Sequence, residues 1–266
     1  MEHSQEKIKV LTVVPCIGLW QQYTKNCIDS ILNSELSENI ENHILLINNG
    51  NDGETAVGIV APEYLGKITV MNSDERMGCQ KSWNYGFAYR TDLYKYKFVI
   101  NNDVLIHRNC IAKLVERMER GDVIMATAMD IRQETTPQAF FDVAPKDEVP
   151  ESEGLNFSAY MVRNDFVDKI GEADEAFAPA YFEDNDLHWR IRVSGEKAVV
   201  FPAAMFYHFG SRTQNSVPGG LVNGIMFNKN RSYFIMKWGG MPGKERFRNP
   251  FDDPKNSIRY TKQNPQ

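Results

Sequence analysis

Short apolar runs alternate with segments of helical periodicity along the first half of the chain. The apolar runs predict strands at residues 8–14, 43–47, 68–71, 97–100 and 122–126. Apolar residues at spacings of three and four predict helices at 21–33, 79–90 and 109–120. This alternation is typical of βαβ units, so the sequence predicts an α/β fold with a mostly parallel central sheet flanked by helices.

The second half of the chain is less regular. Its pattern predicts strands at 156–162, 198–201 and 205–208 and helices at 164–170, 183–193 and 221–238. Gly195 is expected to terminate the helix that begins at 183. Residues 135–150 and 211–220 have the composition of loops, and we expect these loops to close over a bound ligand. The C-terminal extension is predicted to be irregular from residue 241.

The composition is that of an ordinary globular protein. Hydrophobic residues make up 42% and charged residues 24% of the 266 positions, which indicates one large domain or a domain with an appendage. No apolar run approaches the ~20 residues that cross a bilayer, and the polar residues 1–7 are no signal peptide. The scattered cysteines Cys16, Cys27, Cys79 and Cys110 lack CxxC spacing and indicate free thiols. We therefore expect a cytoplasmic protein without an integral membrane segment.

The net charge of −5 argues against a broad nucleic-acid-binding surface, which is normally basic. Basic residues do concentrate near the C-terminus, and a local basic patch therefore remains an open alternative. The residues concerned are Lys244, Arg246, Arg248, Lys255, Arg259 and Lys262.

Polar side chains follow two of the predicted strands directly. The apolar run Phe98–Ile100 leads into Asn101, Asn102 and Asp103, and the run at 43–47 leads into residues 48–53, which are rich in Asn, Asp and Gly. Ligands of open α/β sheets bind at the carboxyl ends of the strands, where a carboxylate among amides suits a divalent cation that carries a diphosphate. The alternative is a pair of turns, which Asn and Asp also favour.

An acidic cluster opens the predicted helix at 183. The general explanation is that carboxylates stabilise a helix N-terminus. The functional alternative is a general base, Asp184 or its neighbour Glu183, that removes a proton from an acceptor hydroxyl. Tyr181 and Phe182 would then supply an apolar wall that raises the pKa of the base.

Two further features are weak signals by themselves. His208 ends a predicted strand before a loop; most single histidines are core or surface residues, yet a neutral imidazole completes cation sites. The segment Gly78–Gly86 is no P-loop, because GxxxxGK[ST] is absent. It is either an ordinary helix start or a place where glycine lets the backbone approach a ligand closely.

Taken together, these motifs resemble the GT-A fold glycosyltransferases of family 2 over residues 8–212. Ile100–Val104 stands in the place of the DXD-like metal motif, with asparagine instead of the first acid. The blocks 158–163, 170–177 and 182–190 look like the acceptor side of the family, and the strand that ends in His208 follows them as the family expects. The resemblance implies a Rossmann-like GT-A sheet with a donor half at about 1–130, an acceptor half at about 131–212 and an extension at 213–266.

The resemblance also assigns roles to residues. It implies that Asp184 is the catalytic base, that Glu183 orients the base or the acceptor, and that Asp103 and His208 hold Mn²⁺ or Mg²⁺. The expected donor-binding residues are Pro15, Cys16, Asn48, Asn49, Arg76, Gly78, Lys81, Asn84, Asn101 and Asn102. The expected acceptor-binding residues are Tyr181, Asp186 and Trp238. Arg212 is a further candidate for the phosphates.

The implied activity is an inverting transfer of a sugar from a UDP-, dTDP- or GDP-sugar to an acceptor hydroxyl. Asn48 departs from the family, since many members carry there an acid that reads the uracil ring, and this leaves the nucleotide base open. The acceptor is a saccharide or another hydroxyl compound, with a modified nucleic-acid base as an alternative. A nucleotidyltransferase or a catalytically silent sugar-nucleotide binding module are the alternative functions.

Overall fold

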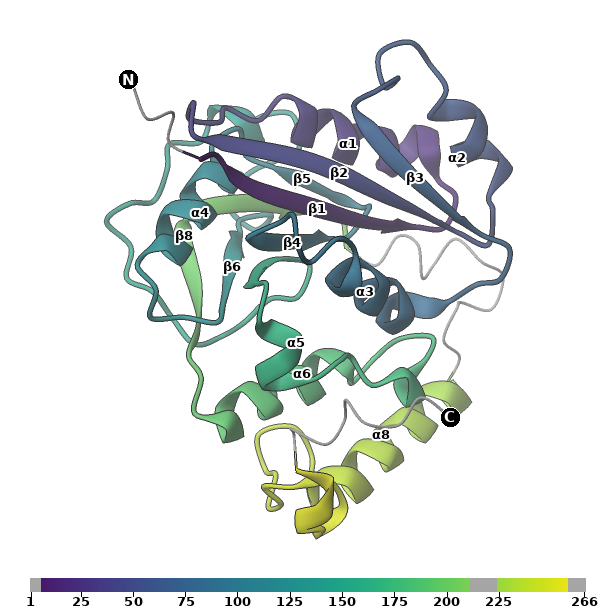
Figure 1. Cartoon of the computed structure of the whole chain (residues 1–266), viewed down its shortest axis with the longest axis vertical. Helices are drawn as coiled ribbons and strands as arrows, with labels where there is room; N and C mark the ends of the chain where they lie inside the picture. The colour runs from purple at the N-terminus through teal and green to yellow at the C-terminus, as the bar shows by residue number, and fades with distance from the viewer. Residues whose placement is uncertain (1–5, 211–223, 258–266) are drawn as a thin grey trace.

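A computed structural model describes residues 6–210 and 224–257 (Figure 1). Within these residues, eight strands form one sheet in the order β3-β2-β1-β4-β7-β6-β8-β5. The strands are β1 (Ile8–Cys16), β2 (Ile40–Asn49), β3 (Ile68–Ser73), β4 (Tyr96–Ile100), β5 (Val104–Ile106), β6 (Met125–Asp130), β7 (Ala159–Arg163) and β8 (Ala198–His208). The helices are α1 (Lys25–Leu32), α2 (Gly53–Gly58), α3 (Gly78–Ala88), α4 (Cys110–Glu119), α5 (Phe166–Ile170), α6 (Glu183–Ser194) and α8 (Gly224–Trp238).

The sheet is parallel in its first half and mixed in its second. β1 pairs in parallel with both β2 and β4, and β2 pairs in parallel with β3. β7 then enters antiparallel to its two neighbours, β4 and β6. β8 runs parallel to β6, and the edge strand β5 runs antiparallel to β8. The α/β prediction is confirmed, but the chain returns through residues 131–158 and enters β7 in the opposite direction.

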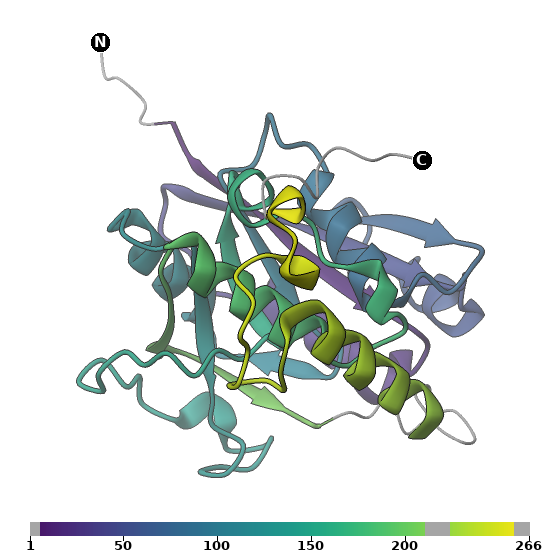
Figure 2. The ribbon, with the colours of Figure 1, turned by 90° about the horizontal axis from the view of Figure 1, so that it is seen from below.

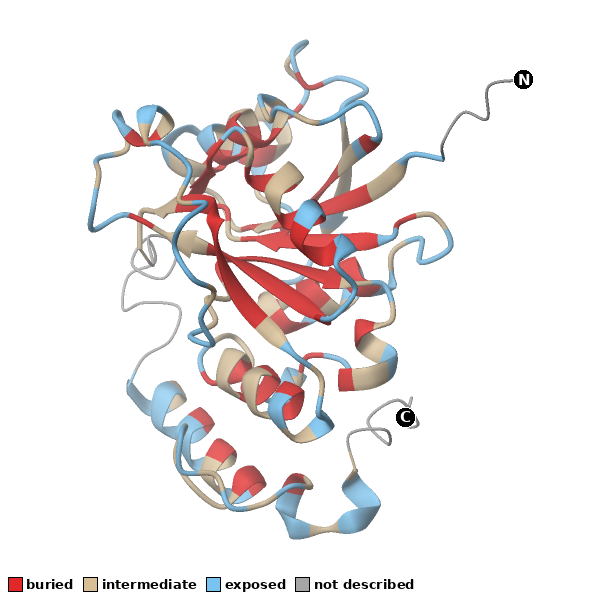
Figure 3. Ribbon diagram, turned by 90° about the vertical axis from the view of Figure 1, so that its left-hand side faces the viewer, coloured by how far each residue is buried: buried red, intermediate tan, exposed pale blue. Residues whose placement is uncertain are grey.

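Helices cover both faces of the sheet, and the strands between them are the most buried part of the molecule (Figure 3). On one face, α1 and α4 contribute Ile28, Ile31 and Leu114 to the larger core cluster. On the other face, α3 and α6 contribute Phe87 and Leu187 to a second cluster. Burial on both faces explains why the predicted strands are continuous apolar runs.

Two local differences from the sequence prediction have physical reasons. β5 was not predicted, because three residues after a polar turn carry no periodic signal. Residues 198–208 form one strand where two were predicted. β8 pairs with β6 across an irregularity in which Phe201 faces Ala128 and Met205 faces Met129, so residues 202–204 are looped out. Pro202 lies in that bulge, where a residue without an N–H group is tolerated.

The segment at 135–150 is held against the edge of the sheet. Phe140 is fully buried, Lys113 forms an ion pair with Asp147, and the Arg108 guanidinium donates to the carbonyl of Phe141. The predicted loop at 211–220 and Arg212 lie outside the described residues. Among the described residues, no helix has both the length and the apolar character that crossing a bilayer requires.

Helix α8 packs below α6, on the side away from the sheet (Figures 1 and 2). Phe234 and Trp238 of α8 form a small cluster with Phe177 and Phe182, all of them buried. After α8 the chain forms only short 3₁₀ turns, Pro250–Asp252 and Pro254–Asn256, so the described part of the tail is irregular as predicted.

Candidate active site

A cavity of about 550 Å³ lies at the carboxyl ends of the parallel strands. β1 contributes Pro15 and Cys16, β2 contributes Asn49, and the turn after β4 contributes Asn101 and Asp103. The predicted site residues that line this cavity are Pro15, Cys16, Asn49, Arg76, Gly78, Asn101, Asn102, Asp103, Tyr181, Glu183, Asp184 and His208. The structure therefore brings donor-side and acceptor-side residues from distant parts of the chain into one space.

Asp103 and His208 lie side by side in this cavity. The Nε2 atom of His208 is 3.2 Å from Oδ1 of Asp103, and its Nδ1 atom is 3.4 Å from the hydroxyl of Ser158. Sheet pairing causes this contact, because β5 and β8 are antiparallel with Val104 opposite His208. The register of this one strand pair thus brings together two residues that are 105 positions apart in the sequence.

The backbone of the turn between β4 and β5 is held from several sides. The amide of Asn101 donates to the carbonyl of Ser158, and its own carbonyl faces the thiol of Cys27. The Asn102 side chain donates to the hydroxyl of Thr24 at 2.8 Å. These contacts fix the turn that presents Asp103, as pre-organisation of a binding site requires.

The carboxylate and the imidazole form a donor set that suits a divalent cation. An aspartate oxygen and an imidazole nitrogen are both ligands of Mn²⁺, and Asn101 and Asn102 border the same cavity. Within residues 6–210 and 224–257, no group of three or more His, Cys, Asp and Glu side chains is close enough to hold a metal ion alone. The two residues therefore fit a cation that takes its remaining ligands from a bound diphosphate and water.

Glu183 and Asp184 begin α6 at the opposite side of the cavity. The two residues before them, Tyr181 and Phe182, have left-handed backbone angles of φ 78° and 73°. Such angles cost free energy for bulky residues and are concentrated at functional sites. They turn the chain sharply at the start of α6, where Glu183 and Asp184 both line the cavity.

The two carboxyl groups have different environments. Burial raises the pKa of Glu183 to about 8, and the charge of Asp184 adds to the effect. Its Oε1 atom accepts from the thiol of Cys79 at 3.4 Å, whereas Oε2 has no hydrogen-bond partner among the residues that the structure describes. Burial also raises the pKa of Asp184, which is only half-buried and accepts from the backbone N–H of Asn185. The deeper burial of Glu183 favours its protonated form, and Asp184, which is more exposed and accepts a backbone N–H, is the better candidate for an ionised base.

Gly78 is the point where α3 meets the loop before α6. Its φ is +75°, and an added Cβ atom would lie 3.3 Å from the carbonyl oxygen of Pro179. The next amide, that of Cys79, donates to the same carbonyl. Glycine is needed here for close approach of two backbones, and this approach closes the cavity between α3 and α6.

Three predicted donor residues lie outside the cavity lining. Asn48 is fully buried and makes a turn: it donates to Asn72 and to the carbonyl of Asp52, and accepts from the Asp52 amide. This is the turn interpretation that the sequence left open, and its physical reason is the tight Asn-Gly-Asn-Asp loop. Lys81 points away to Glu175 at 3.9 Å, and Asn84 binds the backbone of Ala173.

Two predicted acceptor residues are also elsewhere. Asp186 and Trp238 are both completely buried, and the indole Nε1 of Trp238 donates to Asp186 Oδ1 at 2.7 Å. Asp186 also forms ion pairs with Arg190 and Lys237. A carboxylate enclosed by two cations and an indole is saturated, so this network joins α6 to α8 and does not line the cavity.

Several lining residues were missed in the sequence. Arg132 borders the cavity beside Gly210, and its guanidinium pairs with Asp130 at 3.1 Å. Trp83, Asn156 and Phe157 form another part of the wall. Arg132 lies two residues beyond the end of β6 at Asp130, but the predicted strand ended at residue 126, so no signal in the sequence placed it at the sheet edge. Of the basic tail residues, Lys244, Arg246 and Arg248 are exposed and outside the lining, and Arg259 and Lys262 lie beyond the described residues.

Two solved structures share this fold at low sequence identity. One is a crystal structure of GalNAc-T7 with UDP, GalNAc and Mn²⁺, with a TM-score of 0.65 and 14% identity over 87% of this chain and 49% of the other. The second is a crystal structure of S. aureus TarS 1-349, with a TM-score of 0.56 and 14% identity over 77% and 61% of the two chains. The chain thus spans about half to three fifths of these neighbours, and at this identity the likeness establishes the GT-A fold alone.

The sequence itself identifies the family. No curated protein is significantly similar to the chain. The profile of "Glycosyl transferase family 2" matches residues 12–182, which is more than half of the chain. The match begins within β1, includes Asp103 and β7, and ends at the residue before α6. The chain therefore belongs to glycosyl transferase family 2 and has a GT-A fold.

Proposed function

We propose that the protein transfers a sugar from a nucleotide-sugar donor to an acceptor hydroxyl with inversion at the anomeric carbon, and that Asp184 is the general base. The observation that carries this proposal is the shared cavity: Asp184 faces the same space as the Asp103–His208 pair. A base on one side and a diphosphate site on the other are what a single in-line displacement requires.

In this mechanism the donor diphosphate lies against Asp103, His208 and Arg132. Asp103 and His208 would hold a Mn²⁺ or Mg²⁺ ion, which would supply positive charge against the leaving diphosphate. Arg132 adds a guanidinium group, which can donate two parallel hydrogen bonds to phosphate oxygens. Asn49 and Arg76, with Pro15 and Cys16, form the part of the wall that we assign to the nucleoside.

Asp184 accepts the proton of the acceptor hydroxyl as that oxygen attacks the anomeric carbon. Glu183 keeps its own proton, so a second negative charge does not form beside the base. Its contact with Cys79 ties the start of α6 to α3, which fixes the position of Asp184. Tyr181 lies on the rim beside the base with its ring 5.5 Å from Phe227, and we assign it to the acceptor.

The direct test is transfer by Asp184→Asn with a panel of UDP-, dTDP- and GDP-sugars. We expect transfer to fall by at least about a hundredfold, as loss of a general base does, while nucleotide binding persists. Proton NMR of the product is expected to give the anomeric configuration opposite to that of the donor. Near-normal transfer by this variant would disprove the base assignment, and nucleotide binding without transfer or hydrolysis by the unmodified protein would favour a silent binding module.

A further inference from the structure

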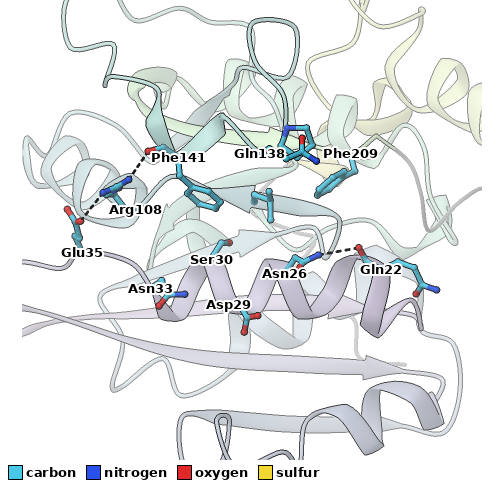
Figure 4. Close-up of a pocket in the computed structure, with 12 residues that line it drawn as sticks. Gln22, Asn26, Asp29, Ser30, Asn33, Glu35, Arg108, Gln138, Phe141 and Phe209 are labelled. Atoms are coloured by element: carbon cyan, nitrogen blue, oxygen red, sulfur yellow. Dashed lines mark hydrogen bonds and ion pairs between the residues drawn. The ribbon is translucent and has the colours of Figure 1, made fainter.

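A second groove, of about 670 Å³, lies outside the donor cavity, between α1 and the segment 137–141 (Figure 4). None of its lining residues has a role in the proposed transfer. Its floor is Leu105 of the edge strand β5 together with Ser30 of α1. We propose that this groove is a carbohydrate-binding site that takes a neutral oligosaccharide.

One wall is a polar stripe along α1 and the turn before it. Gln22, Asn26, Asp29 and Asn33 follow one another at spacings of four, three and four residues, which places them on one helix face (Figure 4). The helical rise makes this stripe about 16 Å long from position 22 to 33. Three amides and one carboxylate over that length offer both donors and acceptors to successive hydroxyl groups of a short sugar chain.

The opposite wall is partly aromatic. Phe141 and Phe209 lie across the groove from the amides (Figure 4). A pyranose has the matching character, because its C–H faces are apolar and its hydroxyl groups point outward from the ring edge. An aromatic wall facing a row of amides therefore suits a saccharide better than a uniformly polar or uniformly apolar ligand.

The charged groups of the groove are already compensated by the protein. Asp29 pairs with Lys25 at 2.7 Å and accepts from the hydroxyl of Tyr64 at 2.8 Å. Arg108 pairs with Glu35 at 3.7 Å. No lysine and no other arginine is among the lining residues, so an anionic ligand such as a nucleic acid would meet little positive potential. This balance favours a neutral ligand.

Both ends of the groove are tied across its width. At one end, Arg108, two residues after β5, forms an ion pair with Glu35. Its guanidinium also donates to the carbonyl of Phe141 at 2.8 Å. At the other end, the rings of Tyr23 and Phe209 are 5.2 Å apart. Walls held in place before binding reduce the entropic cost of association. Phe209, at this second end, directly follows His208 in the sequence. A sugar chain in this groove would therefore lie beside the Asp103–His208 pair of the donor cavity.

The test is direct binding, measured on the full chain without nucleotide or metal ion. Maltotetraose, cellotetraose and chitotetraose are titrated while the amide NMR spectrum is recorded, with glucose and N-acetylglucosamine as single-unit comparisons. We expect saturable shifts around α1 with at least one tetrasaccharide and much weaker binding of the single units. If none of the three tetrasaccharides gives saturable shifts at α1, the proposal is wrong.

Two variants locate the site. Gln22→Ala/Asn26→Ala removes exposed amides, and alanine is the better helix former, so folding is expected to persist. Binding should weaken about tenfold or more, as loss of one or two hydrogen bonds implies. Phe141→Leu keeps an apolar side chain and should also weaken binding. Asn228→Ala, an exposed amide on α8, is the matched control and should bind as the unmodified protein does.

Unchanged binding by the double variant would place the sugar elsewhere and overturn the proposal. The double variant should also keep normal transfer to a small acceptor, because its residues are outside the donor cavity. The binding test uses neither donor nor cation, so its failure would leave the transferase proposal standing, and failure of transfer would leave the binding result interpretable.

Discussion

The indole of Trp238 donates a hydrogen bond to Asp186 across the interface of α8 and α6, in a contact from which solvent is completely excluded. Lys237 and Arg190 form ion pairs with the same carboxylate. The helix that carries Glu183 and Asp184 is therefore anchored by a segment more than forty residues further along the chain. Positioning of the proposed catalytic base, Asp184, depends on the C-terminal helix even though none of the α8 residues lines the cavity.

Asp186→Asn should destabilise the fold strongly. It leaves two buried cations facing a neutral amide, and breaking a buried ion pair from one side costs about 3–5 kcal/mol. Trp238→Phe removes one hydrogen bond and some volume and should cost about 1–3 kcal/mol. Urea unfolding followed by circular dichroism measures both changes. An Asp186→Asn protein of normal stability but with a raised KM for the acceptor would instead support a role in acceptor binding.

Glu183 should make the protein less stable as the pH rises. Its pKa in the folded state is raised to about 8 from an ordinary value near 4.5, so between these values the folded state binds more protons than the unfolded state. Stability from this group is therefore fully present below pH 4.5 and is lost as the pH approaches 8. Melting temperatures of the unmodified protein and of Glu183→Gln, recorded from pH 5 to 8.5, measure the effect.

The difference between the two melting profiles is the informative quantity, because groups distant from the Glu183–Asp184 pair titrate equally in both proteins. We expect the unmodified protein to lose melting temperature relative to Glu183→Gln as the pH increases. Parallel profiles would mean that Glu183 is already ionised in the folded protein and that the charge assignment within the Glu183–Asp184 pair is wrong.

Removal of either member of the Asp103–His208 pair should abolish cation-dependent nucleotide binding. A ligand that binds only the folded state raises the melting temperature by mass action. With UDP, dTDP or GDP as the probe, we expect Mn²⁺ to increase the shift of the unmodified protein but not of Asp103→Asn or His208→Ala. Asp92→Asn, at an exposed carboxylate, is the control. Equal shifts with and without EDTA in the unmodified protein would contradict a cation-bound diphosphate.

Arg132 and Lys81 should differ in their effect on the donor. Arg132 borders the cavity, whereas Lys81 is directed toward Glu175 on the outside of α3. Loss of a charge-assisted contact to phosphate is expected to raise the KM for the donor about tenfold in Arg132→Ala. Lys81→Ala should have the KM of the unmodified enzyme. Steady-state kinetics at saturating acceptor measure the donor KM of both variants. A larger rise in this KM for Lys81→Ala than for Arg132→Ala would show that Lys81, not Arg132, contacts the donor.

The sequence alone determined the features that depend on neighbouring residues. The first strand, the helix from Cys110 to Glu119 and the helix that runs from Glu183 to its glycine cap were all predictable, because periodicity and capping are local properties. The polar end of the strand at 96–100 also identified Asp103 as a cavity residue, since parallel strands present their carboxyl ends at one edge.

Only the tertiary structure decided which of the polar residues share a site. Asn48 and Asn49 are adjacent and chemically identical, yet the first makes a turn with Asp52 while the second lines the cavity. Asp184 and Asp186 are two residues apart on one helix, and only the first meets the cavity. Side-chain direction on a strand or helix is set by register and packing against distant segments. Those contacts, such as Val104 opposite His208 or Trp238 on Asp186, have no local signal in the sequence.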